Sequence, residues 1–434
     1  MLFTNTLQSA QHAVINTLLL KRDLFHFLDQ LALNADSMVF VPMLKGGFWL
    51  LQDPELVRQV LIADEKMIGK PEFLLQSNRG NYGDGLTSLS AEQWQARRTA
   101  SVRAYTPDVL ARMVANTHTA TLKMMAQLPQ NEPLALPDEL LKLVTRIGAQ
   151  WILSTCVEDG ANGAAIPWAE AAGIWHELDL PDEASALMPS RRLRAGATPV
   201  MRTIIREKWG AEPNCGPSDF IGSFYASCQE QGLQLNEQEV FDEIVQLLFA
   251  AHHTVTTTLV NCIAFLHRYP EIKERVVQCA QANRKLANDS ADTTKHQKYT
   301  EYFIKEAMRF CMPTTLLFRQ VRLPLRLADH SLRQDDLIVI SPYLLHRDAR
   351  WFSEPLRFNP ERFRDSNYGY AYLPFGAGKR RCVAHRLALM QIKGIIETLV
   401  LGCELIPLST TPDNLFSVSY PGPDYNVMIK PASY

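Results

Sequence analysis

The stretch that decides the fold is Phe375-Gly376-Ala377-Gly378-Lys379-Arg380-Arg381-Cys382-Val383-Ala384. Its two glycines permit the positive φ angles of a tight loop, and a helical pattern begins just behind Cys382. A thiol at a helix N-terminus beside arginines is favoured as the thiolate, which is the form in which sulfur binds a redox-active iron. A zinc site is disfavoured because only His385 lies nearby. A buried structural cysteine beside a glycine turn is the other alternative.

The composition argues against several classes of protein. The chain has 434 residues, 47% of them hydrophobic, and 44 Lys plus Arg against 46 Asp plus Glu leave a formal net charge of -2. A protein that coats nucleic acid would show a basic excess. The longest apolar run near the start, 13–20, is too short to span a bilayer and lacks a small-residue cleavage site. We therefore expect neither a transmembrane anchor nor a signal peptide.

The 8 cysteines are scattered and form no CxxC pair. This pattern is typical of a protein in a reducing cytoplasm, where most thiols behave as small buried hydrophobes.

A long central helix is the most regular element that the sequence predicts. Asn236, with Glu239 three residues later, is a capping signal, and a mostly apolar run continues to Tyr269 before Pro270 ends it. At about 1.5 Å per residue such a helix would cross a whole domain. Further helices are predicted over 54–63, from Trp94 onward, and over 108–128, 138–156, 166–178, 299–310 and 383–401.

The β-type patterns are fewer. Residues 37–52 are apolar and broken by Gly46-Gly47, which predicts a hairpin, and alternating residues recur near 318–328 and 332–341. Residues 80–85 read as a turn-rich loop. No linker divides the chain. We expect one mainly α domain over 1–434, with a small β-rich region at about 35–65 and 315–345 and a helical core at about 90–310 and 375–402.

The quoted stretch resembles the haem-ligand loop of the cytochrome P-450 superfamily, Phe-x-x-Gly-x-Arg-x-Cys-x-Gly. It matches at Phe375, Gly378, Arg380 and Cys382, and it departs at Ala384, which adds one methyl group near the haem edge. The resemblance spans roughly residues 35–430 in element order and implies the P-450 fold, with its long central helix over the haem. It further implies that Cys382 is the metal ligand of haem b and that Phe375 and Arg380 contact the haem.

The first of three further matches is the Glu-x-x-Arg pair formed by Glu306 and Arg309. Positions three apart face one another on a helix, and Arg362 in Pro-Glu-Arg-Phe supplies the third member that the family adds. The resemblance implies that these three residues form a fold-locking network beneath the haem.

The second match is Trp94 with Arg98, which at i and i+4 point the same way on a helix. The resemblance implies that both bind the haem propionates, as Arg319 and Arg380 would, because a guanidinium pairs with a carboxylate through two parallel hydrogen bonds. Taken alone, Trp94 is equally well explained by core packing.

The third match lies midway along the long helix, at Ala250-Ala251-His252-His253-Thr254-Val255. In the family this is where the helix opens beside bound dioxygen, so the resemblance makes Thr254 and His253 the catalytic candidates. Thr254 would donate a hydrogen bond to dioxygen. His253 stands where the family usually has an acid, and histidine relays protons near neutral pH. Without the other motifs, a His pair in an apolar helix indicates packing.

His-His-Thr in this helix and Met390-Gln391-Ile392-Lys393 resemble the sterol 14α-demethylase branch of the superfamily, as do 176–179 and 189–192. That branch carries an aromatic-rich substrate segment ahead of the Trp94 helix. Here Phe73-Leu74-Leu75 and a short polar stretch replace it. We therefore expect a relative of this branch that acts on a substrate other than a sterol.

The resemblance also indicates which side chains line the substrate pocket. Their apolar character predicts an apolar small molecule, a specialised metabolite or a lipid. They are Phe73, Leu178, Leu247, Ala250, Ala251, Leu316 and Leu317. Arg191, Arg192 and Arg194 either meet a substrate carboxylate or are simply solvated.

Together these matches imply a haem-thiolate monooxygenase that hydroxylates or otherwise oxidises its substrate with dioxygen. No reductase domain fits in the chain, so NAD(P)H electrons are expected to arrive through an external ferredoxin or flavodoxin and its reductase. Lys379, Arg381 and Arg97 form a basic face for such an acidic partner, or a merely solvated one. We expect a cytoplasmic monomer.

Two alternatives stay open at this point. One is oxidative radical coupling of phenolic or aromatic substrates on the same haem, and the other is a non-catalytic haem-thiolate ligand sensor. The presence of Thr254 favours oxygen activation over sensing.

Overall fold

The computed structural model describes residues 2–32, 36–153, 202–203, 205–207, 209, 220–289, 297–408 and 425–431. Residue contacts divide the chain into two compact units. Unit 1 contains the residues up to Glu72 together with Lys305–Cys382, and unit 2 contains Phe73–Ile304, Val383–Leu415 and the last strand. Each unit thus combines early and late parts of the chain, and the single domain over 1–434 stays a prediction.

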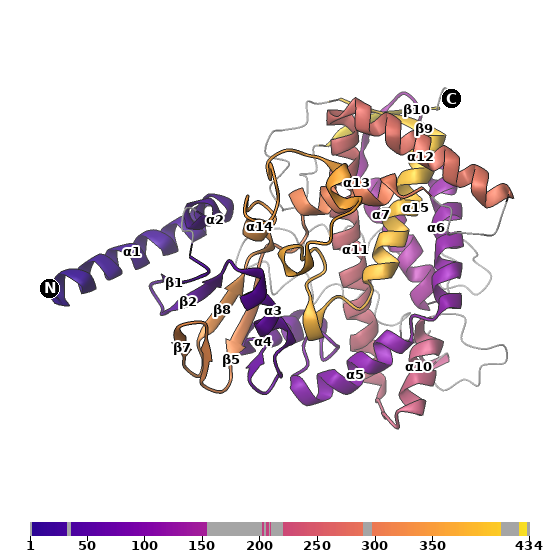
Figure 1. Cartoon of the computed structure of the whole chain (residues 1–434). Helices are drawn as coiled ribbons and strands as arrows, with labels where there is room; N and C mark the ends of the chain where they lie inside the picture. Colours follow the sequence, from indigo (N-terminus) through magenta and orange to yellow (C-terminus); the bar gives the residue numbers. More distant parts are fainter. Residues whose placement is uncertain are drawn as a thin grey trace. The chain divides into compact units, whose positions relative to one another are not determined.

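Unit 1 is built on a five-stranded sheet in the order β1-β2-β8-β5-β3, in which only β2 and β8 run parallel (Figure 1). A separate two-stranded sheet joins β6 to β7. The strands are β1 (Met38–Pro42), β2 (Gly47–Leu51), β3 (Ile68–Gly69), β5 (Leu317–Val321), β6 (Leu325–Leu327), β7 (His330–Leu332) and β8 (Leu337–Ile340). The predicted hairpin over 37–52 is confirmed as β1 and β2.

Both faces of this sheet are buried, because successive residues of a strand point to opposite faces. Leu51 and Ile340 belong to a core cluster with α3, whereas Leu50 and Val339 belong to a cluster with α2. Asp53 caps α3 as predicted, since its carboxylate accepts from the N–H groups of the first turn. The helices of unit 1 are α1 (Leu2–Arg22), α2 (Leu24–Ala32), α3 (Pro54–Ile62) and α14 (Pro342–Leu345), with 3₁₀ turns at 360–363, 369–371 and 378–380.

Unit 2 is a helical bundle around α11, which packs against α7, α12 and α15 (Figure 1). A small sheet in the order β4-β10-β9 lies in the same unit. The helices are α4 (Glu72–Tyr82), α5 (Ala91–Arg103), α6 (Pro107–Gln127), α7 (Leu136–Leu153), α10 (Phe220–Glu230), α11 (Glu237–Arg268), α12 (Pro270–Asp289), α13 (Tyr299–Phe310) and α15 (His385–Gly402), and the strands are β4 (Pro133–Ala135), β9 (Cys403–Pro407) and β10 (Asn426–Pro431). The first residue of α4 and the last six of α13 belong to unit 1.

The predicted central helix is confirmed as α11, and its start is a complete capping box between Asn236 and Glu239. It ends at Arg268, and Pro270 is at the same time the first residue of α12, because proline is tolerated in the first turn of a helix. α11 is long and apolar enough to cross a membrane, but 67% of its apolar window is buried inside the protein, as in the core helix of a bundle.

One local prediction was wrong. Residues 80–85 do not form a loop throughout, because α4 continues through Gly80 to Tyr82 and the chain turns only at Gly83, where φ is +87°. The helix predicted near 166–178 lies outside the described residues. The thiols of Cys228, Cys262, Cys279, Cys311 and Cys403 are buried as expected.

Candidate functional site

The loop around Cys382 is a tightly closed backbone turn at the end of unit 1. Gly376 and Gly378 have φ angles of +63° and +66°, and a Cβ atom on Gly378 would lie 2.0 Å from the carbonyl oxygen of Leu61. Only glycine therefore fits where the loop meets the end of α3. The N–H of Cys382 donates to the carbonyl oxygen of Phe375 at 2.9 Å, and the side chain of Cys382 is exposed. The loop thus holds a thiol outward on a fixed backbone.

Ala384, which stands where the family loop has glycine, is the N-cap of α15 with φ -94° and ψ 16°. This backbone conformation does not require glycine, so the substitution carries no backbone strain.

A cluster of cations around a single carboxylate lies in the same unit. Arg380 makes a bidentate pair with Glu65, with Nε–Oε1 and Nη2–Oε2 distances of 2.8 and 3.0 Å. Arg319 is buried and donates to the carbonyl oxygen of Phe318. Burial lowers the pKa of Arg319 to about 10. Burial, with the charges of Arg380 and Arg319 next, lowers the pKa of Lys70 to about 8.

Three cations and one carboxylate leave an excess of two positive charges in a largely buried place, which an anionic ligand would neutralise. The two propionates of a haem have the required charge, so the donor set fits this cofactor. Lys70 was missed from the sequence. A single lysine after a two-residue strand carries no pattern, and only the packing brings it beside Arg319 and Arg380.

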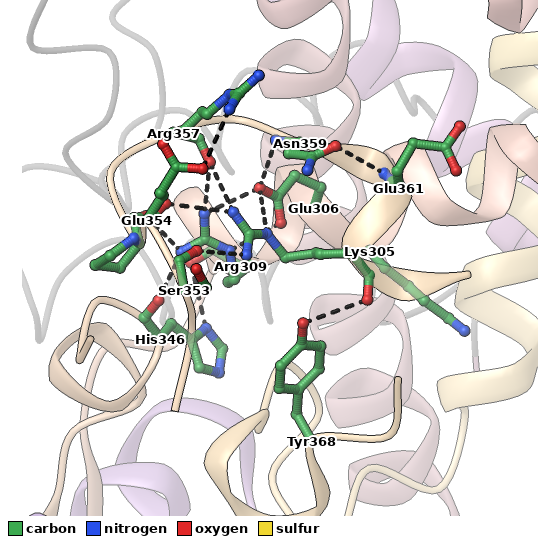
Figure 2. Close-up of polar contacts among 12 residues, drawn as sticks. Lys305, Glu306, Arg309, His346, Ser353, Glu354, Arg357, Asn359, Glu361 and Tyr368 are labelled. Atoms are coloured by element: carbon green, nitrogen blue, oxygen red, sulfur yellow. Dashed lines mark hydrogen bonds and ion pairs between the residues drawn. The ribbon is translucent and has the colours of Figure 1, made fainter. Parts of the chain in front are cut away.

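Glu306, on α13, accepts hydrogen bonds from two buried guanidiniums (Figure 2). Arg309 donates to both of its oxygens at 2.8 and 2.9 Å, and Arg362 donates to Oε1 at 3.0 Å. The N–H of Asn359 adds a fourth bond at 2.8 Å. Arg309 also donates to the carbonyl oxygens of Pro355 and His346. The buried charges are therefore paired and hydrogen-bonded on all sides, as stability in a low-dielectric interior requires.

Trp94 and Arg98 lie together on α5, as their spacing predicts. The guanidinium of Arg98 is 5.5 Å from the centre of the Trp94 ring, and Trp94 is buried. The intervening Arg97 does not form part of an exposed basic face, which corrects that expectation. It is buried and pairs with Glu239 at 3.0 Å and Glu243 at 3.4 Å on α11. Lys379 and Arg381 are exposed.

Three buried side chains in the first half of α11 form hydrogen bonds with the loop that precedes α5. Asp242 accepts from the N–H of Asp84, Glu243 from that of Leu86 and Gln246 from that of Thr87, at 2.8 to 2.9 Å. Gln246 also donates to the carbonyl oxygen of Gly83 and to the hydroxyl of Ser88. All three side chains are thus engaged with the loop. The spacing of the capping signal predicts the helix but not this contact.

The middle of α11 presents a stripe that the rest of the chain covers only in part. Leu247, Ala250, Ala251 and Thr254 recur at i, i+3, i+4 and i+7 and are half-exposed or exposed, whereas Val255 and the residues after it are buried. The hydroxyl of Thr254 donates to the carbonyl oxygen of Ala250 at 2.9 Å. The longest core helix thus carries an incompletely buried stripe of small and apolar residues.

The two adjacent histidines have different surroundings. His252 is buried, and burial lowers its pKa to about 4. It faces α7, where a Cβ on Gly148 would lie 3.2 Å from its Nε2. His253 is half-exposed. His252 is therefore a neutral packing residue at physiological pH.

The remaining predicted pocket residues are spread over several elements. Phe73 on α4 is 53% exposed. Leu316 packs against the cluster that includes α2, and Leu317 against the cluster that includes α3, so these neighbours point to opposite faces of the sheet. Leu178, Arg191, Arg192 and Arg194 lie outside the described residues. Among the described residues, no group of three or more His, Cys, Asp or Glu side chains could hold a metal ion.

Comparison with known proteins agrees with this geometry. The family model described as Cytochrome P450 matches residues 187–428, more than half of the chain. A probable cytochrome P450 4aa1 of Drosophila melanogaster is 24% identical over 413 residues, covering 86% of this chain and 78% of its own. A cyclooctat-9-en-7-ol 5-monooxygenase of Streptomyces melanosporofaciens is 25% identical over 414 residues, covering 91% and 88%.

Two solved structures share the fold. The retinoic acid-bound cyanobacterial CYP120A1 superposes with a TM-score of 0.76 at 19% identity, covering 91% of this chain and 92% of its own. The haem domain of cytochrome P450DA superposes with a TM-score of 0.75 at 18% identity, covering 94% and 92%. The mainly helical fold with small β regions is thereby confirmed, and the chain belongs to the cytochrome P450 family as a haem-dependent monooxygenase.

Proposed function

We propose that this P450 oxidises an apolar small molecule, a lipid or a specialised metabolite, that lies along the half-covered stripe of α11. The observation that carries the proposal is the stripe itself, since Leu247, Ala250 and Ala251 offer apolar and small surfaces and Thr254 offers one hydroxyl. The names of two related proteins fit such a ligand. Cyclooctat-9-en-7-ol and retinoic acid are both mostly hydrocarbon with a single polar group.

The haem would be held by the ligand loop and the cation cluster. Cys382 is proposed as the thiolate ligand of haem b, with Phe375 beside it. Arg319, Arg380, Lys70 and Arg98 would neutralise propionate charge, and the indole N–H of Trp94 would donate a hydrogen bond to a propionate. When bound, the haem supplies the activation of dioxygen, and the protein positions the substrate and excludes competing reactions.

Thr254 and His253 are proposed to deliver protons beside the stripe. The hydroxyl hydrogen of Thr254 is engaged by the carbonyl oxygen of Ala250, so the hydroxyl oxygen remains available as an acceptor. A donor such as His253, half-exposed one residue earlier, would carry protons in from solvent. To pass a proton on, Thr254 would accept one from such a donor while its own hydroxyl hydrogen turns from the carbonyl oxygen of Ala250 toward the reacting atoms. The main-chain hydrogen bonds of the helix would stay intact.

The electron route and the setting of the enzyme complete the proposal. NAD(P)H electrons would arrive through an external ferredoxin or flavodoxin and its reductase, and the exposed cations Lys379 and Arg381 would attract such an acidic protein. The proposed enzyme is a cytoplasmic monomer.

An optical titration of the haem-loaded protein tests the substrate class. Fatty acids, sterols, terpenoids and aromatic metabolites are added in turn, with an azole as the control that reports an accessible iron. A low-spin to high-spin shift with an apolar class supports the proposal, and a sterol hit would overturn the expectation of a non-sterol substrate. Turnover under labelled dioxygen then separates oxygen insertion, which incorporates label, from radical coupling, which does not, and from a sensor, which gives no product.

The ligand assignment has its own test. We expect Cys382→Ala to lose the thiolate-type spectrum of the ferrous carbon-monoxide complex completely, while Cys403→Ala, at a buried thiol, keeps it. An unchanged spectrum in Cys382→Ala would remove Cys382 from the iron.

A further inference from the structure

His346 is a completely buried imidazole between α13 and the chain that leads into the ligand loop (Figure 2). It follows α14 as its C-cap. Its Nδ1 lies 3.3 Å from the carbonyl oxygen of Arg309, and its Nε2 accepts from the N–H of Leu373 at 2.8 Å. A carbonyl requires a donor and an N–H requires an acceptor, so only the neutral ring with its hydrogen on Nδ1 satisfies both.

The surroundings hold this ring in one orientation and one protonation state. The backbone carbonyl of His346 accepts from Nη1 of Arg309 at 2.6 Å, and the rings of Tyr372 and Phe352 lie 5.1 and 6.1 Å away. Burial, followed by the positive charge of Arg309, lowers the pKa of His346 well below its usual value. The ring therefore stays neutral, as its two hydrogen bonds require.

From Leu373 to Cys382 the loop is closed by two hydrogen bonds between backbone groups. The carbonyl oxygen of Leu373 accepts from the N–H of Gly376 at 3.1 Å, and that of Phe375 accepts from the N–H of Cys382 at 2.9 Å. The imidazole of His346 thus connects this closed loop to the last turn of α13, where Arg309 is paired with Glu306. The neighbouring Tyr372 adds a second link, since its hydroxyl donates to the carbonyl oxygen of Lys305 at 2.8 Å.

We propose that His346 is a positioning residue for the iron ligand. Its neutral ring fixes Leu373 relative to α13 and thereby sets the position of the loop that carries Cys382. The proposal rests on the proposed function only in naming Cys382 as the ligand. It assigns to His346 a task that shape alone would not perform, because an acceptor must stand at the position of Nε2 to hold the N–H of Leu373, while the backbone of His346 is itself held by Arg309.

Two substitutions separate these hydrogen bonds. In His346→Gln the amide oxygen reaches the position of Nε2 and can accept from Leu373, whereas in His346→Asn the amide reaches only the position of Nδ1 and can donate to Arg309. His330→Asn is the matched control, because His330 lies in the same unit with its ring 4.8 Å from Trp49. The readouts are the hydrogen-exchange rate of the Leu373 amide and the fraction of the carbon-monoxide complex with a thiolate-type spectrum, both in the haem-loaded protein.

We expect the Leu373 amide to exchange roughly tenfold to a hundredfold faster in His346→Asn, with a loss of thiolate-type spectrum, while His346→Gln and His330→Asn stay close to the wild type. Equal behaviour of the Gln and Asn variants in both readouts, in a wild type that is thiolate-ligated, would overturn the role of His346 alone. A wild type without the thiolate-type spectrum would overturn the assignment of Cys382 instead, whatever the exchange rates are.

Discussion

The surroundings of Glu306 and the middle of α11 are both central to a P450, yet they are built in opposite ways. Around Glu306 every charge has partners from distant segments, and Glu306 and Arg309 are 0% exposed. Along α11, the hydroxyl of Thr254 bonds only to the carbonyl four residues earlier among the contacts described, and the stripe to which it belongs is half-exposed or exposed. A saturated network fixes the segment from Pro355 to Arg362 onto α13, whereas the stripe on α11 keeps part of its small and apolar surface exposed.

The largest effect is expected where the saturated network is broken. Glu306→Gln leaves two buried guanidiniums without their carboxylate, so the free energy of unfolding should fall by about 3–5 kcal/mol. Denaturant titration of the haem-loaded protein measures this loss. Glu301→Gln is the matched control, because its pair with Lys393 is partly exposed and is worth about 1 kcal/mol or less. Equal losses in both variants would remove the contrast between the network and an ordinary surface pair.

Acid should distinguish the buried face of α11 from its open stripe. The pKa of His252 is lowered to about 4 in the folded protein, so the neutral ring favours folding. The contribution of the neutral ring to the free energy of unfolding is complete above a pH of about 6.5. It is lost as the pH falls from there through about 4, and the loss amounts to about 3 kcal/mol. The unfolding free energy of His252→Leu, measured against pH, should therefore decline less steeply in this window than that of the wild type.

Thr254→Val serves as the control for this titration, since Thr254 is half-exposed on the stripe and carries no group that titrates in this window. We expect its pH profile to run parallel to that of the wild type. If the His252→Leu profile also follows the wild type, burial of this ring does not disfavour its protonated form, and the prediction is wrong.

A smaller loss of stability is expected at the loop that is hydrogen-bonded to Asp242, Glu243 and Gln246 of α11. Gly83 has φ +87°, and a Cβ there would lie 2.1 Å from Cγ of Asp242, so Gly83→Ala should destabilise the protein by about 1–3 kcal/mol. Gly80 lies in α4, where an added methyl group would have nothing within 4 Å, so Gly80→Ala should be neutral or stabilise by up to about 1 kcal/mol. Thermal unfolding compares the two variants. An unchanged melting temperature in Gly83→Ala would show that the loop can move away from Asp242 at little cost in stability.

The smallest change in stability, but a specific change in chemistry, is expected on the stripe. Thr254→Ala should alter the unfolding free energy by no more than about 1 kcal/mol, while the ratio of peroxide released to product formed should rise. Thr258→Ala is the matched control, since Thr258 makes the same bond to the carbonyl four residues earlier but is buried. Full coupling in Thr254→Ala, or equal peroxide release in both variants, would remove Thr254 from proton delivery.

Much of this architecture could be predicted because it is encoded locally. The capping box at Asn236 and Glu239 marked the start of α11, Asp53 and Pro54 marked α3, and Gly46-Gly47 marked the hairpin. The ends of α4 could not be predicted in the same way. Gly80 weakens a helix by only about 1 kcal/mol, while Leu75 is buried and the Tyr82 ring stacks on that of Phe249 at 4.2 Å, and both contacts favour the helix through Tyr82.

The candidate site likewise has a part that is encoded locally in the sequence and a part that depends on tertiary packing. Sequence by itself determined the glycine turns ahead of Cys382, the Glu306 to Arg362 set and the helical spacing of Leu247, Ala250, Ala251 and Thr254, because each is a fixed spacing within one element or a family pattern. Only the tertiary structure decided that Lys70 joins Arg319 and Arg380, that Arg97 is buried against Glu239 and Glu243, and that His346 bridges α13 to the loop. The physical reason is that spacing fixes the face of an element on which a side chain lies, whereas its burial, its partner and its charge state depend on which other element packs against that face.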